Sequence, residues 1–381
     1  MIYVHVPFCR SFCTYCDFYS EVVGGCRQSL PGTWSPAATV RDDLFQRYTD
    51  DICAEIRARR DEIAASTGVR TLYMGGGTPS VLPLECLRRI VEKLREVEGY
   101  WEEFTVEVNP EDIVERGPSY VEGLLSLGVN RISMGVQSLD DGMLRWMNRR
   151  HSADGARGAW KIISEACAGR LDRSIDLISG VPGMDCAMLE RTLDEVLEWR
   201  PEHISAYQLS VEEGSALARM IAEGRVSELP DEQCREQYDL ICRKLAAAGY
   251  HHYEISNWAL PGHEAVHNSA YWTRQPYVGL GPGAHSLEIL PCQKEPKTSD
   301  PPAKKVGGPS KTAIIAGAPE LGREIRTWNS RRPTGWGEEG REVLTEEEIR
   351  EETVMLLART DRGPIPERDW FIADELIPDL L

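Results

Sequence analysis

The chain has 381 residues, 41% hydrophobic and 27% charged, as expected for a globular fold with one large domain or a large and a small one. Its formal net charge of −18 opposes binding to a phosphate backbone, so nucleic acid is not an expected partner. No apolar run reaches the length of a transmembrane segment and no basic leader follows Met1, so the eleven cysteines predict metal ligands and buried thiols in a reducing, cytoplasmic compartment.

Six short runs rich in apolar and β-branched residues predict strands, and helical periodicity separates several of them. The strands are expected at 2–7, 70–75, 104–108, 131–136, 174–179 and 203–209. The clearest helices are expected at 153–168, 187–199 and 231–248. Repeated alternation of strand and helix favours a parallel α/β architecture, either an open or partial barrel or a doubly wound sheet.

Polar and glycine-rich segments follow the carboxyl ends of consecutive predicted strands. They are residues 5–9, 75–79, 107–110, 135–138, 176–180 and 207–210. In a barrel the carboxyl ends of the strands meet on one face, which is where sites on barrels are built. This arrangement favours a barrel over a doubly wound sheet.

The pattern changes after about residue 250. Residues 250–272 are rich in histidine and aromatic side chains, residues 291–322 resemble a flexible insertion, and 344–359 predicts a helix with an acidic first turn. A second insertion-like loop is expected at 24–38. We therefore divide the chain into a barrel core (1–215), an extension (216–290), a linker (291–322) and a small C-terminal part (323–381).

Three cysteines, Cys9, Cys13 and Cys16, follow the first predicted strand with the spacing C-x3-C-x2-C. Three thiolates on one loop can hold one face of an iron–sulfur cubane and leave one iron open to a ligand. A closed zinc site needs a fourth ligand, for which His5 is the only local candidate. A redox dithiol or plain buried thiols also fit the spacing alone.

The cysteine motif, together with the strand-end segments around it, resembles the radical SAM superfamily. In that family three cysteines hold a [4Fe–4S] cluster, and S-adenosylmethionine (SAM) chelates the fourth iron through its amino and carboxylate groups. One electron from the cluster cleaves SAM to methionine and a 5′-deoxyadenosyl radical. The protein binds and orients SAM and excludes water. The resemblance extends over roughly residues 1–290, and more weakly from 320 onward, and implies a partial (β/α)6 barrel of the TIM type.

The segment Gly75-Gly76-Gly77-Thr78-Pro79 lets the backbone approach a ligand closely and offers N–H donors to a carboxylate, although the composition alone favours a tight turn. By resemblance it receives the methionyl part of SAM, with Gly76, Gly77 and Thr78 as contacts.

Glu107 and Asp176 stand at or near strand ends in apolar surroundings, where a carboxylate needs an arginine or a ligand, or else forms a local salt bridge or helix cap. The resemblance places both in the SAM site. It adds further SAM contacts at Tyr3, Tyr15 (to the adenine), Gln137 and Arg149, with Gln208 and His285 at two positions where the family varies more.

Within the superfamily the chain is similar to the oxygen-independent coproporphyrinogen oxidase group, and most similar to its heme chaperones of the HemW type. The oxidases have a fourth cysteine two residues after the third, where this chain has Phe18. The oxidases also have a long extension before the cysteine motif. The hexapeptide 267–272 resembles a heme-binding H-N-x-x-Y-W signature. Its residues His267, Asn268, Tyr271 and Trp272 would supply an imidazole and flat apolar area, unless they form a packed aromatic corner.

These features lead us to expect a heme chaperone that binds the cluster, SAM and heme, and passes heme to an acceptor protein. His251, His252 and His263 are alternative iron ligands. The implied electron donor is a flavodoxin or ferredoxin. The alternative is an enzyme, an oxygen-independent coproporphyrinogen III oxidase (a dehydrogenase) that makes protoporphyrinogen IX. The family usually ends in a small winged-helix-like domain, which we expect to be truncated here because about 20 residues follow Arg359.

Overall fold

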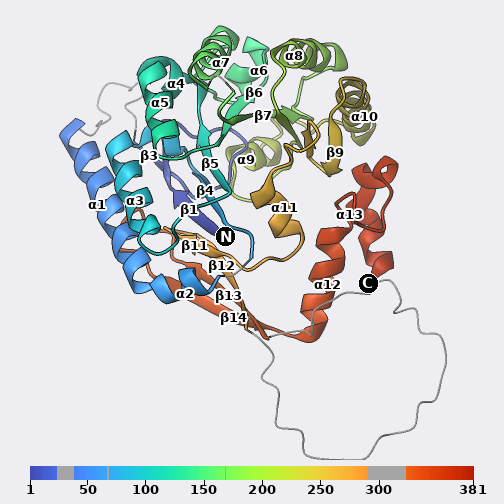
Figure 1. The fold of residues 1–381 in the computed structure, drawn as a ribbon. Coiled ribbons are helices and arrows are strands. Elements are labelled where there is room, and N and C mark those ends of the chain that lie inside the picture. The colour runs from blue at the N-terminus through green and yellow to red at the C-terminus, as the bar shows by residue number, and fades with distance from the viewer. Residues whose placement is uncertain (24–37, 67, 168, 291–322) are drawn as a thin grey trace, which may run out of the picture.

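The computed structural model describes residues 1–381 except 24–37, 67, 168 and 291–322 (Figure 1). Both expected insertions, 24–38 and 291–322, therefore lie almost entirely outside the described residues. The six predicted strands are all confirmed. They are β1 (Ile2–Val6), β4 (Thr71–Gly76), β5 (Glu103–Val108), β6 (Arg131–Gln137), β7 (Asp172–Ser179) and β8 (His203–Gln208).

These six strands run parallel in chain order, and three short strands extend the sheet at its edges. Strand β11 (Val278–Leu280) pairs parallel with β1, while β10 (Asn257–Ala259) and β9 (His251–Glu254) follow β8 in antiparallel order. No pair joins β9 to β11 among the described strands, so the barrel is partial. The range 216–290 thus contributes three edge strands to the core sheet.

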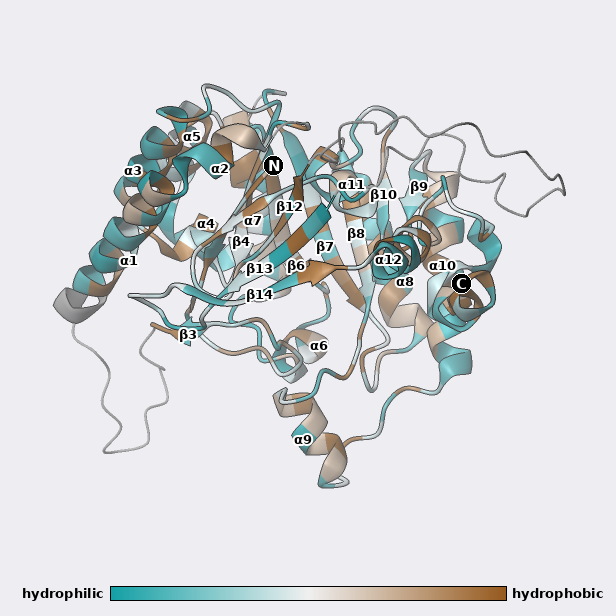
Figure 2. Cartoon of the chain, turned by 90° about the horizontal axis from the view of Figure 1, so that it is seen from below, coloured by the Kyte–Doolittle hydropathy of each residue, from teal (hydrophilic) through white to brown (hydrophobic). Residues whose placement is uncertain are grey.

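Helices cover the outer face of the curved sheet (Figure 1). Three of them confirm the predicted helices, namely α7 (Ala153–Cys167), α8 (Cys186–Trp199) and α10 (Asp231–Ala247). The others that precede β8 are α1 (Ala38–Ala58), α2 (Arg60–Ala65), α3 (Leu84–Arg95), α4 (Pro110–Arg116), α5 (Pro118–Ser126) and α6 (Asp141–Trp146). Two later helices lie at the ends of the barrel, α9 (Ala216–Ala222) near the cysteine loop and α11 (Val266–Trp272) at the amino-terminal ends of the strands. In Figure 2 helices such as α1 and α3 show both hydrophilic and hydrophobic residues, as expected when one face of a helix packs on a core.

The strands alternate between apolar residues that face the helices and polar residues that face the inside of the barrel. In β6, Ile132, Met134 and Val136 belong to the hydrophobic core, whereas Arg131 and Ser133 line an internal cavity. Side chains alternate between the two faces of a strand, so this period of two gives a barrel with an apolar outer face and a polar interior.

A smaller antiparallel sheet follows the barrel, with strands β12 (His285–Leu290), β13 (Arg323–Asn329) and β14 (Glu338–Leu344). Helix α12 (Glu346–Leu357) confirms the helix expected at 344–359, and a reciprocal capping box between Thr345 and Glu348 explains its first turn. The chain then forms short helical turns, including α13 (Ala373–Leu376). Every helix within the described ranges is too short or too polar to cross a bilayer.

Candidate active site

A cavity of about 470 Å³ opens at the carboxyl ends of the strands and continues into the polar interior of the barrel. The three motif cysteines line its mouth, and Arg131 and His203, from the first residues of β6 and β8, line its deepest part. The cavity brings together thirteen of the residues that the sequence singled out. They are Cys9, Cys13, Tyr15, Cys16, Gly76, Gly77, Thr78, Glu107, Gln137, Arg149, Asp176, Gln208 and Asn268.

The cysteine loop is held in place by its backbone. Cys9 ends the short strand β2 (Phe8–Cys9), which pairs with β3 (Glu21–Val22), and the Thr14 N–H donates to the Met147 carbonyl at 3.1 Å. The three thiols form no disulfide and are each partly exposed to the cavity. The loop therefore presents three thiols together at the mouth.

The donor set at this loop fits an iron–sulfur cluster better than a single metal ion. Within the described ranges no three histidine, cysteine or acidic side chains converge on one point, as a closed zinc site would require. In an iron–sulfur cluster, by contrast, each thiolate binds a different iron. The Arg149 guanidinium donates to the Cys13 sulfur at 3.4 Å, which places a positive charge beside the cysteine loop. Both ring nitrogens of His5 bind elsewhere, to the Tyr3 hydroxyl and the Tyr19 carbonyl.

The glycine segment has a different role from the one its composition indicates. The Gly77 N–H donates to the Val6 carbonyl and the Thr78 N–H to the Phe8 carbonyl, each at 2.8 Å, so these two donors are not free for a carboxylate. A Cβ on Gly77 would lie 2.7 Å from the Val6 carbonyl oxygen. The glycines let this loop pack against the cysteine loop, and the idea that these N–H groups bind a ligand is wrong in this conformation. The Thr78 hydroxyl lies 3.6 Å from the Cys9 sulfur.

Two carboxyl groups project into the cavity without an arginine partner, which was one of the two partners expected, the other being a ligand. Glu107 accepts hydrogen bonds from the Tyr73 hydroxyl at 2.7 Å and from the Gly76 N–H at 3.2 Å. Asp176 accepts from the Ser133 hydroxyl at 2.9 Å. Burial raises the pKa of Glu107 to about 7 and that of Asp176 to about 6, because it disfavours the charged form. Such a pair would bind a cationic ligand.

Gln137 and Arg149 lie beside each other at the end of β6. Gln137 has a φ of 66°, in the left-handed region that non-glycine residues rarely occupy, and the β6–β7 register shifts at this point. The Arg149 guanidinium donates to the Gly135 carbonyl at 2.8 Å and to the Asn109 side chain. The strained turn therefore directs the Gln137 side chain into the cavity, next to the guanidinium that contacts Cys13.

Two of the residues expected to touch SAM do not line the cavity. The Tyr3 hydroxyl bonds to the His5 ring at 3.0 Å, and its ring packs against Tyr73. His285 begins β12 and stacks against Trp328. Several cavity residues were not predicted, although the period-two polar alternation within the strands could have revealed them. They are Tyr73, Thr105, Arg131, Ser133, Ser174, His203 and Ser205.

Helix α11 carries the H-N-x-x-Y-W hexapeptide, and its residues point in different directions. His267 is 1% exposed, and its two ring nitrogens contact the Thr71 hydroxyl at 2.7 Å and the Tyr271 hydroxyl at 3.2 Å. Burial lowers the pKa of His267 to about 3, so its ring is neutral. Asn268 lines the cavity, whereas Tyr271 packs on Tyr277 and Trp272 is partly exposed. In this conformation His267 belongs to a packed aromatic corner.

A partial α/β barrel with three cysteines and a glycine-rich loop at its carboxyl face defines the radical SAM class of fold, and residues 3–196 match the Radical SAM superfamily. The chain is 35% identical over 287 residues to the heme chaperone HemW of Mycobacterium tuberculosis (strain ATCC 25618 / H37Rv), covering 74% of this chain and 68% of that one. It is 32% identical over 289 residues to HemW of Bacillus subtilis (strain 168), with shares of 74% and 69%. The chain therefore belongs to the radical SAM superfamily and, within it, to the family of HemW-like proteins.

The similarity also extends along nearly the whole chain. Radical S-adenosyl methionine domain-containing protein 1, mitochondrial, of Bos taurus is 31% identical over 378 residues, which cover 97% of this chain and 75% of that one. Among solved structures, coproporphyrinogen III oxidase (HemN) from Escherichia coli aligns with a TM-score of 0.67 at 21% identity, covering 100% of this chain and 81% of that chain. The structural match confirms the fold.

Proposed function

We propose that this protein binds a [4Fe–4S] cluster and SAM at the carboxyl face of the barrel. The observation that carries the proposal is that Cys9, Cys13 and Cys16 open together onto one cavity. Two carboxyl groups with raised pKa lie deeper inside it. Membership of the radical SAM superfamily supports it. When bound, the cluster would supply the electron for reductive cleavage of SAM.

The residues of the cavity suit the separate parts of SAM. Its ammonium and sulfonium groups are positive, and a positive group beside Glu107 and Asp176 favours their ionised forms. The ring of Tyr15 borders the cavity between the second and third cysteines and offers a flat surface to the adenine. Gln137 supplies an amide at the strained end of β6, and Arg149 holds the cysteine loop through Cys13.

We further propose that the protein is a heme chaperone, which binds heme and delivers it to an acceptor protein. The curated HemW relatives and the hexapeptide on α11 support this proposal. Phe18 supports it as well, since it occupies the position where the oxidases have a fourth cysteine, and its side chain is exposed beside the cavity. Tyr271 and Trp272 would offer apolar area to the porphyrin.

The accessibility of the histidines directs the search for the iron ligand. His267 and His252 are buried with both ring nitrogens engaged. His251, at the start of β9, and His263, on the segment before α11, are partly exposed. The Nδ1 atom of His263 contacts Asp172 at 2.8 Å, an arrangement that orients an imidazole and leaves Nε2 for a metal. Both ring nitrogens of His251 lie near carboxylates, Nδ1 at 3.4 Å from Glu264 and Nε2 at 3.3 Å from Asp361. A heme iron would therefore reach Nε2 of His263 with the fewest changes, and without rearrangement of α11.

The test is anaerobic reconstitution with iron and sulfide, followed by addition of SAM and heme to wild type, His267→Ala, His263→Ala and His251→Ala. We expect a cluster signal by EPR, a Soret band in wild type, and a weakened or shifted band in the variant that lacks the iron ligand. A wild-type protein without a Soret band would refute the heme proposal. Stoichiometric zinc without a cluster signal would refute the cluster proposal.

The second candidate function is oxidation of coproporphyrinogen III to protoporphyrinogen IX. The complete cavity with its three cysteines and two carboxyl groups favours it, together with the fold shared with HemN. An anaerobic assay with coproporphyrinogen III, SAM and a chemical reductant distinguishes the two functions. Formation of protoporphyrinogen IX would reverse our ranking.

A further inference from the structure

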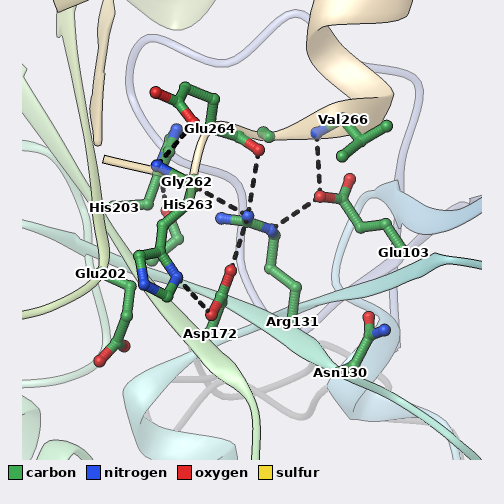
Figure 3. A network of polar contacts seen from close by, with 12 residues as sticks. Glu103, Asn130, Arg131, Asp172, Glu202, His203, Gly262, His263, Glu264 and Val266 are labelled. Atoms are coloured by element: carbon green, nitrogen blue, oxygen red, sulfur yellow. Dashed lines mark hydrogen bonds and ion pairs between the residues drawn. The ribbon is translucent and has the colours of Figure 1, made fainter. Parts of the chain in front are cut away.

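The deep end of the cavity is closed by an ion network, of which the function proposed above uses only the contact between Asp172 and His263 (Figure 3). Arg131 is the first residue of β6, and its side chain is 5% exposed. Its guanidinium contacts Glu103 on β5 at 3.0 Å and Asp172 on β7 at 2.9 Å. Arg131 thus joins the amino-terminal ends of three neighbouring strands.

The same network binds the segment that leads into α11. The Arg131 guanidinium donates to the His263 carbonyl at 2.9 Å, and the Asp172 carboxylate contacts the His263 ring at 2.8 Å. The Glu103 carboxylate accepts from the Val266 and His267 N–H groups, each at 2.9 Å. Figure 3 shows Arg131 between Glu103 and Asp172, with both carboxylates turned towards the 262–266 segment.

The segment so held forms part of the floor of the cavity. Ala265 and Asn268 line the same cavity as the three cysteines, although they come from the opposite end of the barrel. The Ala265 N–H also donates to the Tyr253 hydroxyl at 3.3 Å, and that hydroxyl contacts the His203 ring at 2.8 Å. Five backbone groups of residues 263–267 therefore bind side chains that project from the amino-terminal ends of the barrel strands and from β9.

A network of this kind determines position more than it adds stability. Apolar side chains of similar volume often stabilise a protein as well as a buried ion pair does, whereas a guanidinium fork between two carboxylates requires one geometry. Lysine, a point charge on a flexible stem, does not reproduce the fork. Replacement of Arg131 would leave Glu103 and Asp172 without their shared partner and would release the start of α11.

We propose that Arg131 is a positioning residue which, through Glu103 and Asp172, seats the 263–268 segment as the floor of the cavity and so holds the heme-motif helix α11 in register with the barrel. The functional consequence of this inference rests on the heme-chaperone proposal, since it assigns Arg131 to the heme-binding side of the molecule. The cysteine loop lies at the other end of the cavity and does not contact this network.

The test compares Arg131→Met, Arg131→Lys and Glu103→Gln with Arg173→Met. Arg173 is a matched control because it starts on the same side of the barrel, on β7, and pairs with Glu202 at 2.7 Å, yet no hydrogen bond joins its side chain to residues 262–267. Hydrogen exchange of each variant is followed by mass spectrometry, and iron content and heme affinity are measured after anaerobic reconstitution.

We expect exchange in residues 263–268 to accelerate by about tenfold or more in Arg131→Met and Glu103→Gln, less in Arg131→Lys, and not in Arg173→Met. Heme affinity should fall in the same order while the iron content stays at the wild-type level. Unchanged exchange in Arg131→Met would overturn the inference, as would an equal loss of heme affinity in Arg173→Met. If wild type binds no heme, the function proposed above fails, and the exchange data still decide whether Arg131 holds the segment.

Discussion

The two carboxyl groups of the cavity make a pH-dependent contribution to stability that one substitution can isolate. Glu107 is surrounded by Tyr73, the glycine loop and the charge of Asp176, and burial raises its pKa from 4.5 to about 7. Below pH 4.5 the group is protonated in both the folded and the unfolded chain. Between pH 4.5 and about 7 only the unfolded chain ionises, so stability falls as the pH rises.

The size of this effect follows from the shift. One pKa unit corresponds to about 1.4 kcal/mol, so the rise to about 7 lowers the free energy of unfolding by about 3 kcal/mol at pH 8 relative to pH 4.5. This is an upper limit because the carboxyl borders the cavity. Glu107→Gln has no ionisable group and loses this dependence, although it weakens one hydrogen bond at a cost of about 1 kcal/mol.

The assay is urea unfolding of the metal-free protein and of Glu107→Gln between pH 5 and pH 8 under reducing conditions. We expect the variant to be no more stable than wild type at pH 5 and more stable at pH 8, with a change in the difference of about 2 to 3 kcal/mol. Glu122→Gln, on the exposed face of α5, is the control for the same substitution at the surface. A difference between Glu107→Gln and wild type that does not change with pH would refute the argument.

Three further outcomes follow from the site. Cys13→Ala should abolish the EPR signal of the reconstituted cluster, whereas Cys86→Ala, a buried thiol on α3, should retain it. Gly77→Ala should destabilise the protein by about 1 to 3 kcal/mol and lower the iron content, because the added methyl meets backbone atoms, whereas Gly99→Ala faces open space and should leave the iron content unchanged. SAM affinity, measured by anaerobic calorimetry, should increase as the pH rises from about 5 to 7 because a cation favours ionised Glu107, and the Glu107→Gln variant should show a weaker dependence; equal pH dependence in both proteins would contradict this assignment.

Much of the barrel could be predicted from the sequence because the strands have a regular apolar pattern and most of them end at a turn-forming residue. The outward residues of the strands are largely apolar and buried under helices, and glycine, proline or asparagine directly follows four of the six, namely β1, β4, β5 and β7. The short strands β9, β10 and β11 could not be predicted, since three or four residues carry no periodicity and their pairing depends on the edges of a sheet already formed.

The candidate site was predictable where side chains carry the chemistry, and less so where the backbone does. Cys9, Cys13 and Cys16, with Glu107, Asp176 and Arg149, come together as expected. The N–H groups of Gly77 and Thr78 are occupied by the carbonyls of Val6 and Phe8. The sequence does not reveal this pairing, because the two partners are distant along the chain.

Two positions near α11 show why a residue type alone misleads. His267 attracts attention as a ligand, yet Thr71 and Tyr271 engage both nitrogens, a fact that depends on the packing of α11 against β4. Arg131 was not predicted as a site residue, because an arginine at the start of a strand is usually a surface residue.

The separation of an apolar outer face from a polar interior has a consequence for how such a barrel diversifies. The residues that hold the fold together lie between the sheet and the helices, while those that line the cavity point the opposite way along the same strands. An interior side chain such as Ser133 or Thr105 can therefore change with little loss of packing, provided its hydrogen-bond partner is satisfied. New ligand preferences can arise in this scaffold one interior residue at a time, without a compensating change in the shell that folds it.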